Sequence, residues 1–311
     1  MNNKSLVWIL FIFLSLTWGS SFILMKRAMY PAEDEVMVFG PFQVGALRIT
    51  LAGLVLLPLA LRARKMLTRK SIPLLFVTGF FGNLLPAMMF TLAETNIDSS
   101  LAGLLNSTTS FFVVVIGVFF YRSKPSIYQL IGLALGSTGL YLVLSSHFDI
   151  DSTKDIRYAF FIFPATLGYA ISLTTIKFKL QHIPPLSITS LSFLLNLPLS
   201  IIAVFATKAY LPIFEAPNGL SGFGYLSILS ILGTAIAVML FNKLISISNH
   251  IFSSAIAYML PVVAIFIGVL DGENFPVINL IWMVLIILGV LLMNQSPEKL
   301  KQRAENKVGK K

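Results

Sequence analysis

The chain has 311 residues, of which 56% are hydrophobic and 12% charged, and its mean hydropathy is +0.85. A soluble domain has about 45–50% apolar and about 25% charged residues, so this composition excludes a water-soluble globular fold and an intrinsically disordered chain. The net charge of +10 does not indicate nucleic-acid binding, because the basic residues lie in short gaps between apolar runs. The sequence has no cysteine, which excludes disulfides, thiolate metal sites and a cysteine nucleophile.

Ten apolar runs follow one another along the chain, and each has about the 20 residues that a helix needs to cross a bilayer. Lipid offers the backbone no hydrogen-bond partners, so runs of this length are expected to be helices rather than strands. The first run lacks an evident small-residue cleavage site, which favours a retained helix over a signal peptide. The sequence therefore predicts an all-α integral membrane protein with ten transmembrane helices. The ten runs are 6–25, 39–61, 72–93, 99–120, 126–146, 158–176, 186–206, 220–241, 251–270 and 276–294.

Basic residues are divided unequally between alternate connections. One side would carry 17 of the 23 Lys and Arg residues, and the other side only five, together with eleven of the 13 acidic residues. Cytoplasmic loops keep the positive charge, so both termini are predicted to be cytoplasmic. The basic tail at 297–311 is expected to meet anionic lipid on that face.

The two halves of the chain are weakly similar at an offset of about 150 residues. Because five helices per half is an odd number, the second half is expected to sit inverted in the membrane, as in alternating-access carriers. The expected organisation is one repeat over 1–148, an inverted repeat over 149–296 and a cytoplasmic tail over 297–311. The alternative explanation is chance matching among apolar residues. The ordered matches include Trp18 with Tyr169, Ser21 with Ser172, Gly117 with Gly268, and Gly139 with Gly289.

Six short motifs lie along the two halves of the chain. They are Trp-Gly-Ser-Ser-Phe at 18–22, Ala-Leu-Arg at 46–48, Ser-Ser-Ala at 253–255, Pro-Val-Val at 261–263, Gly-Glu at 272–273 and Leu-Gly-Val at 288–290. In type and spacing this set resembles the EamA family of the drug/metabolite transporter superfamily, over essentially the whole chain. The resemblance implies ten helices in inverted five-helix repeats. It also implies export or exchange of amino acids or similar small metabolites, and we expect a multi-pass protein of the bacterial plasma (inner) membrane.

The first half departs from the family pattern at two places. Ser110 stands where the family usually has proline, and Arg122-Ser123 stands where it has glycine-glutamate. No role is therefore transferred from the family to these positions.

Arg48 is the only charged residue well inside a predicted span. An arginine at bilayer depth costs about 2.5–3.5 kcal/mol on the mild insertion scale, so it requires an anionic or carbonyl partner. It is either a ligand for a substrate carboxylate or a side chain that reaches the outer interface and holds neighbouring helix ends. The sequence leaves both interpretations open.

Neutral polar and aromatic residues inside the spans form a second group of candidates. A single asparagine in a bilayer more often bonds a neighbouring helix than lines a wet cavity. Trp18 and Tyr169 occupy equivalent repeat positions, which favours a place at the transport site, where repeat-related helices meet. Aromatic walls with a few polar groups suit an amphipathic metabolite. With Arg48, the predicted substrate-binding residues are Trp18, Ser21, Asn83, Asn106, Tyr169, Asn242 and Tyr258.

The placement of titratable residues bears on energy coupling. No Asp or Glu lies in the middle of a span, whereas Glu94, Asp98 and Glu273 lie near the outer ends. Facilitated export or exchange is therefore the expectation, and a proton-coupled drug/metabolite exporter is an alternative.

Three other classes of function fit the sequence less well. A carrier of phosphorylated metabolites or nucleotide sugars needs several cations in its cavity, and only Arg48, with Lys26 and Lys177 at helix ends, is available. A membrane enzyme is not expected, because no metal motif, nucleophile motif or paired intramembrane carboxylates occur, and the repeat disfavours a channel or receptor. We expect no cofactor, no metal and no nucleic-acid partner. The expected partners are a small-molecule substrate and the lipid bilayer, with a monomer as the working expectation.

Overall fold

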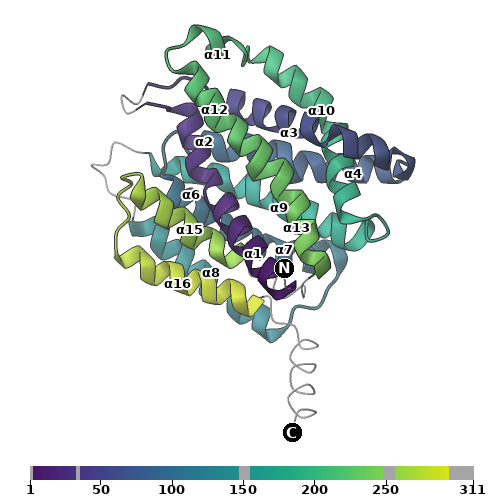
Figure 1. Cartoon of the computed structure of the whole chain (residues 1–311). Helices are drawn as coiled ribbons and strands as arrows, with labels where there is room; N and C mark the ends of the chain where they lie inside the picture. Colours follow the sequence, from purple (N-terminus) through teal and green to yellow (C-terminus); the bar gives the residue numbers. More distant parts are fainter. Residues whose placement is uncertain (1–2, 33–35, 147–154, 248–255, 294–311) are drawn as a thin grey trace.

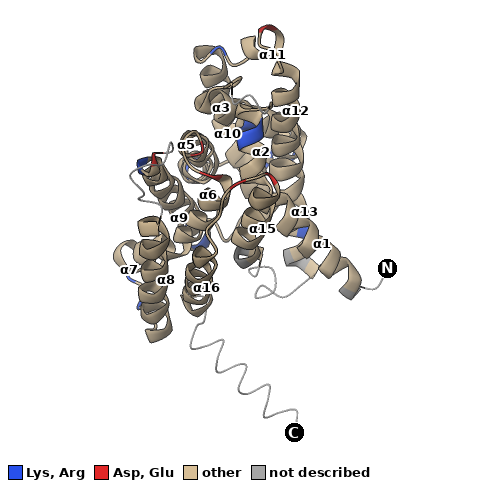
Figure 2. Cartoon of the chain, turned by 90° about the vertical axis from the view of Figure 1, so that its left-hand side faces the viewer, with Lys and Arg blue, Asp and Glu red and all other residues tan. Residues whose placement is uncertain are grey.

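The computed structural model describes residues 3–32, 36–146, 155–247 and 256–293. All the regular secondary structure within these residues is helical. The helices pack side by side as a bundle, and Figure 1 shows α8 and α16 together along one edge and α3 and α10 together toward the opposite one. In Figure 2, Lys, Arg, Asp and Glu positions interrupt the ribbon of this bundle at few places.

Within the described residues, eight helical stretches are long and apolar enough to cross a membrane, by length and composition. They are Ser5–Met29, Pro41–Met66, Ser71–Ala93, Ser99–Tyr121, Ile127–Ser146, Ile156–Lys179, Pro185–Ala206 and Gly219–Leu244. Two shorter apolar helices follow, Met259–Leu270 and Ile278–Met293. Each of the ten apolar runs in the sequence overlaps one of these stretches, and the all-helical membrane architecture is confirmed.

Most spans are built from more than one element. The elements are α1 (Asn3–Gly19), α2 (Ser21–Met29), α3 (Pro41–Ala63), η1 (Arg64–Met66), α4 (Ser71–Gly79), η2 (Phe80–Leu84), α5 (Leu85–Ala93), α6 (Ser99–Leu105), η3 (Asn106–Thr108), α7 (Thr109–Tyr121), α8 (Ile127–Ser146), η4 (Ile156–Phe161), α9 (Ile162–Lys179), α10 (Pro185–Ala206), α11 (Leu211–Glu215), α12 (Gly219–Ser230), η5 (Ile231–Ile236), α13 (Ala237–Ile247), α15 (Ile256–Leu270) and α16 (Ile278–Met293).

Two spans contain a π-helical segment, η2 and η5, which begin 151 residues apart. Each has glycine as its third residue, Gly82 in η2 and Gly233 in η5. In the first span Pro86 has no N–H, so the carbonyl of Gly82 loses its ordinary partner and the wider turn is favoured. In the second, the carbonyl of Gly233 accepts a hydrogen bond from the indole Nε1 of Trp18 at 3.1 Å. Such segments often occur at functional sites.

The two π-helical segments are touched in the same way by helices from the other half of the chain. Ser172 in α9 would lie 2.4 Å from a Cβ added at Gly82, and its hydroxyl donates to the carbonyl of Thr78 at 3.1 Å. Ser21 in α2 would lie 3.3 Å from a Cβ added at Gly233. Both members of the first pair lie 151 residues from their counterparts in the second.

Two long helix pairs hold the bundle together, α3 with α10 and α8 with α16. Thr50 donates to Ser200 across the first pair, with 3.0 Å between the hydroxyl oxygens. In the second pair, a Cβ on Gly289 would lie 2.6 Å from the carbonyl oxygen of Gly132, so the two backbones meet without side chains between them. Such close approach of small residues is how helices gain packing energy in lipid.

Replacing Gly289 with alanine should destabilise the protein by about 1–3 kcal/mol, because the added methyl group overpacks the contact between α8 and α16. Gly224→Ala is the matched control. No atom lies within 4 Å of a Cβ added at Gly224, and the change should be neutral or stabilise α12 by up to about 1 kcal/mol. Thermal unfolding of both variants in detergent measures the difference. Equal melting temperatures would contradict the close packing.

Candidate functional site

Three of the predicted site residues converge on the π-helical segment η5. Trp18, from α1, donates to the carbonyl of Gly233, and its ring packs edge-on against Phe241 with 5.1 Å between centroids. Ser21, from α2, lies beside Gly233, and its hydroxyl donates to the carbonyl of Thr17 at 3.0 Å. Arg48 reaches the same segment from α3. Residues far apart in the sequence therefore meet at one irregular turn inside the bundle.

Arg48 is half-buried inside the bundle. Its Nε donates to the hydroxyl of Thr234 at 3.3 Å, and its Nη1 lies 3.3 Å from the sulfur of Met25. Protein surrounds the side chain, yet it keeps accessible surface. Within the described residues no carboxylate lies within 4.0 Å of its guanidinium. Tyr169 and Glu94 act on it only through longer-range electrostatic interactions.

The other predicted site residues are not all brought to η5. Asn83 in η2, Asn106 in η3 and Tyr169 in α9 are all half-buried, and the Tyr169 ring lies 6.1 Å from that of Phe90. Asn242 donates to the carbonyl of Val238 in its own helix at 2.8 Å. No hydrogen bond between described residues joins Asn106 or Asn242 to the group at η5. The side chain of the remaining candidate, Tyr258, lies outside the described part of the structure.

Asn196, by contrast, has a packing role. It is buried in α10, and its amide nitrogen donates to the carbonyls of Phe76 at 3.2 Å and Ser192 at 2.9 Å. A Cβ added at Gly79 would lie 2.1 Å from that nitrogen. Asn196 therefore ties α10 to α4.

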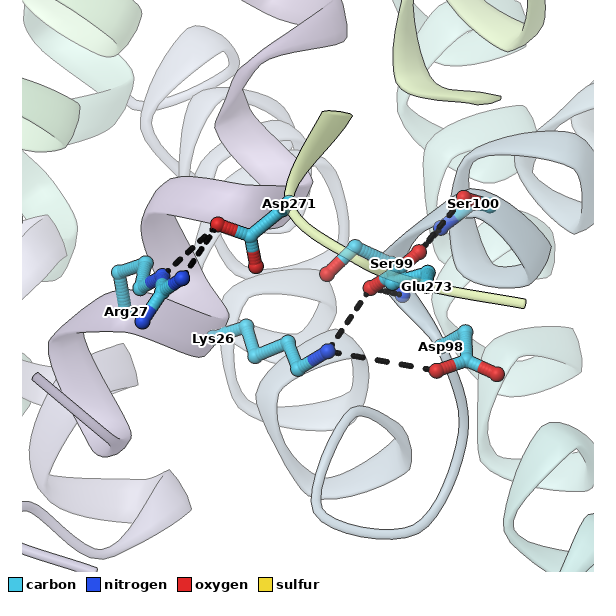
Figure 3. A network of polar contacts seen from close by, with 7 residues as sticks. All are labelled: Lys26, Arg27, Asp98, Ser99, Ser100, Asp271 and Glu273. Carbon is cyan, nitrogen blue, oxygen red and sulfur yellow. Dashed lines mark hydrogen bonds and ion pairs between the residues drawn. The ribbon is translucent and has the colours of Figure 1, made fainter. Parts of the chain in front are cut away.

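A second polar site lies at one end of the bundle and centres on Glu273, which follows α15 (Figure 3). One carboxylate oxygen accepts hydrogen bonds from Lys26 Nζ at 2.9 Å and from the backbone N–H of Ser99 at 2.8 Å. The other accepts from the backbone N–H of Ser100 at 2.9 Å and from its hydroxyl at 2.5 Å. These two N–H groups begin α6, so the positive end of the helix dipole also favours the negative charge.

A neighbouring ion pair extends this group. Arg27 donates from Nε and Nη2 to one oxygen of Asp271, at 2.9 and 2.6 Å. Asp98 lies 4.0 Å from the ammonium group of Lys26. These residues come from α2, from the loop before α6 and from the segment after α15 (Figure 3). We call Lys26, Arg27, Asp98, Asp271 and Glu273 the closing cluster.

The environment of Glu273 favours its charged form. Burial alone would raise the pKa of this carboxyl, but the charge of Lys26 and the hydrogen bonds from Ser100 and Lys26 outweigh burial and hold the pKa below its ordinary value. The close approach also requires a glycine, since a Cβ added at Gly268 would lie 2.3 Å from a carboxylate oxygen of Glu273.

Glu94, directly after α5, is the exception among the acids at this end. It is 2% exposed, and neither of its carboxyl oxygens has a hydrogen-bond partner among the described residues.

The sequence predicts that Glu94, Asp98 and Glu273 lie near the same end of the bundle, but nothing in it indicates that Lys26 pairs with Glu273. It missed Met25 and Thr234 as neighbours of Arg48, because nothing distinguishes them from other residues of their helices.

A comparison with protein-family models identifies the class of protein that this arrangement belongs to. The EamA-like transporter family model matches the chain twice, over residues 6–145 and 156–295. The chain therefore belongs to the EamA-like transporter family, and it is a multi-pass membrane protein.

Relatives and a solved structure agree with this assignment. An uncharacterized transporter in the trpA 3' region of Buchnera aphidicola subsp. Schlechtendalia chinensis is 24% identical over 63% of this chain and 63% of its own length. An uncharacterized transporter of Archaeoglobus fulgidus is 23% identical over 61% of this chain and 64% of its own length. A solved crystal structure superposes with a TM-score of 0.58 at 17% identity, over 94% of this chain and 96% of that one, and supports the fold.

If the closing cluster holds this end of the bundle together, the single substitution Glu273→Gln should make the end more accessible to solvent. Ser99 is buried, and the chain has no native cysteine, so Ser99→Cys reports access of a membrane-impermeant maleimide. Adding Glu273→Gln should speed labelling several-fold, because the acceptor for Lys26 loses its charge. Relative to the labelling of an exposed cysteine at the same pH, lowering the pH should also speed labelling, but only below about 4.5, since a lowered pKa keeps Glu273 charged above that value.

Arg157→Gln is the matched control, because it breaks an exposed ion pair with Asp155 and should leave the labelling rate unchanged. Equal rates for Glu273→Gln and Arg157→Gln, in folded protein, would show that Glu273 does not hold this end closed.

Proposed function

We propose that the chain is an alternating-access transporter that exports or exchanges small carboxylate-bearing metabolites, most specifically amino acids or related amphipathic compounds. The observation that carries this proposal is the position of Arg48. It is a cation inside the bundle, it is half-buried, and it has no carboxylate partner among the described residues.

Such a guanidinium is poorly satisfied by a hydroxyl and a thioether. A substrate carboxylate would supply two charge-assisted hydrogen bonds in a geometry that arginine matches well. Trp18 and Tyr169 would offer aromatic surface to an apolar or amphipathic substrate body. A single cation fits one carboxylate better than a phosphate ester or a nucleotide sugar, which requires several cationic contacts.

The proposed architecture is ten transmembrane helices in two inverted repeats, over 1–148 and 149–296. Three observations support it: the family model matches twice, the two π-helical segments lie 151 residues apart, and each segment is touched by a serine from the other half. Inverted repeats of this kind place the substrate near the midplane, between the halves. The tail at 297–311 lies outside the described residues.

The closing cluster gives this conformation a closed end. Lys26 and Arg27 belong to the first proposed repeat, and Asp271 and Glu273 belong to the second. A substrate can leave at this end only after these ion pairs separate. We propose that this end faces the outside and that both termini are cytoplasmic, because only five of the 23 Lys and Arg residues lie on the side of Glu273 and 17 lie on the other.

Replacing Arg48 with alanine should lower the rate of amino-acid efflux from proteoliposomes by about tenfold or more, because a charge-assisted pair worth about 1.5–3 kcal/mol is lost. The liposomes are loaded with a mixture of amino acids and small metabolites, and efflux is read by mass spectrometry. Arg62→Ala is the matched control, since Arg62 lies on the same helix but is exposed at its end. Full efflux by correctly inserted Arg48→Ala protein would assign Arg48 a structural role.

Reporter fusions test the proposed orientation. An enzyme reporter that is active only outside the cytoplasm should be inactive after Arg69 and active after Asn96, because α4, η2 and α5 carry the chain across the bilayer between these residues. Activity after Arg69 would reverse the orientation and place the closing cluster inside.

A further inference from the structure

Glu94 is a buried acid that the proposed transport site does not use. Its side chain is sealed in the protein, and both carboxyl oxygens lack a hydrogen-bond partner among the described residues. A buried carboxylate without donors is strongly disfavoured, whereas the neutral acid is tolerated. Burial, and next the negative charge of Glu273, raise the pKa of Glu94 well above its ordinary value.

The charged groups around Glu94 do not provide a counter-ion for it. Lys26 already bonds Glu273, and Arg27 bonds Asp271. Only Arg48 is left without a carboxylate, and it acts on Glu94 from a distance rather than as a bonded partner. Titratable groups on the elements around Glu94 are Lys26 in α2, Arg48 in α3, Asp98 before α6, Tyr158 in η4, Tyr169 in α9 and Glu273 after α15. Arg157 in η4 is exposed and pairs with Asp155.

We propose that Glu94 is a proton-binding site, and that a proton on Glu94 and a substrate carboxylate at Arg48 bind cooperatively, so that transport is coupled to protons. The second half of this statement rests on the proposed function of Arg48, and the first half stands without it.

Cooperativity follows from the shared cation. Arg48 is one of the two positive charges that favour the ionised form of Glu94. A carboxylate bound to Arg48 offsets that charge, so Glu94 holds its proton more tightly. Coupling between two sites is reciprocal, and therefore a protonated Glu94 also strengthens binding of the carboxylate.

Burial selects a proton over a substrate amine as the ligand. The Glu94 oxygens expose almost no surface, so an organic ammonium group cannot reach them in this conformation. Opening of the adjacent closing cluster would separate Lys26 from Glu273 and admit water. The Glu94 carboxyl would then release its proton to water and become a carboxylate, with Lys26 free to favour that charge. No covalent bond of the substrate changes.

Infrared spectroscopy of the purified full-length protein tests the proton site without any substrate. At neutral pH the wild-type protein should show a C=O stretch of a protonated carboxyl that is missing in Glu94→Gln. Glu215→Gln is the matched control, because Glu215 is exposed and its substitution should leave that band in place. A Glu94→Gln spectrum that keeps the whole band would overturn the assignment.

Exchange measurements test the coupling. Proteoliposomes with the same pH and the same amino-acid mixture on both sides should show an apparent affinity that falls about fivefold or more as the pH rises above neutral, because the proposed site holds its proton at neutral pH and loses it only at higher pH. Glu94→Gln mimics the protonated acid and should hold the high affinity at every pH. Wild-type-like pH dependence in Glu94→Gln would overturn the coupling and leave the carrier intact. Absence of exchange in the wild type, with the infrared band present, would overturn the proposed function and with it the coupling, and leave the proton site standing.

Discussion

The contact between α2, α6 and the segment after α15 depends on how completely the carboxylate of Glu273 is satisfied. A carboxylate taken out of water is costly unless it gains a full set of donors. Glu273 gains two backbone N–H groups at the start of α6, a hydroxyl and the ammonium group of Lys26. One side chain therefore joins α2, α6 and the segment after α15. The donors come from α2 and α6 and the acceptor from the segment after α15, so these hydrogen bonds hold only while the three elements stay in contact.

The interior differs from the closing cluster because two of its titratable groups have no oppositely charged partner within 4.0 Å among the described residues. Arg48 has a hydroxyl and a thioether but no carboxylate within reach, and Glu94 has no hydrogen bond at all among the described residues. Unsatisfied polar groups in a low-dielectric environment are expensive and mark functional sites. We propose one ligand for each group: a substrate carboxylate for Arg48 and a proton for Glu94. The two ligands are then linked through the charge of Arg48.

Much of the fold could be predicted from the sequence, because a bilayer admits few architectures. Apolar runs of about 20 residues located the spans, and the motifs around Trp18 and Gly272 indicated the family. The site was harder. Arg48 stood out because a charge inside a span is rare, but its neighbours Met25 and Thr234 carry no signal in sequence. Glu94 was placed near a helix end with the other acids. Only packing distinguishes it from Glu273, since one acid is fully bonded and the other is buried without partners.

The most direct test of this account is the distance across the closing cluster during transport. The chain has no cysteine, so spin labels attached to a Thr95→Cys, Asn274→Cys variant would lie at these two positions alone. Electron–electron double resonance would then measure the distance between the end of α5 and the segment after α15. We expect one short distance without substrate and a second, longer population when the amino-acid mixture is added, with the longer population dominant in Glu273→Gln. A single unchanged distance under all three conditions would contradict the account.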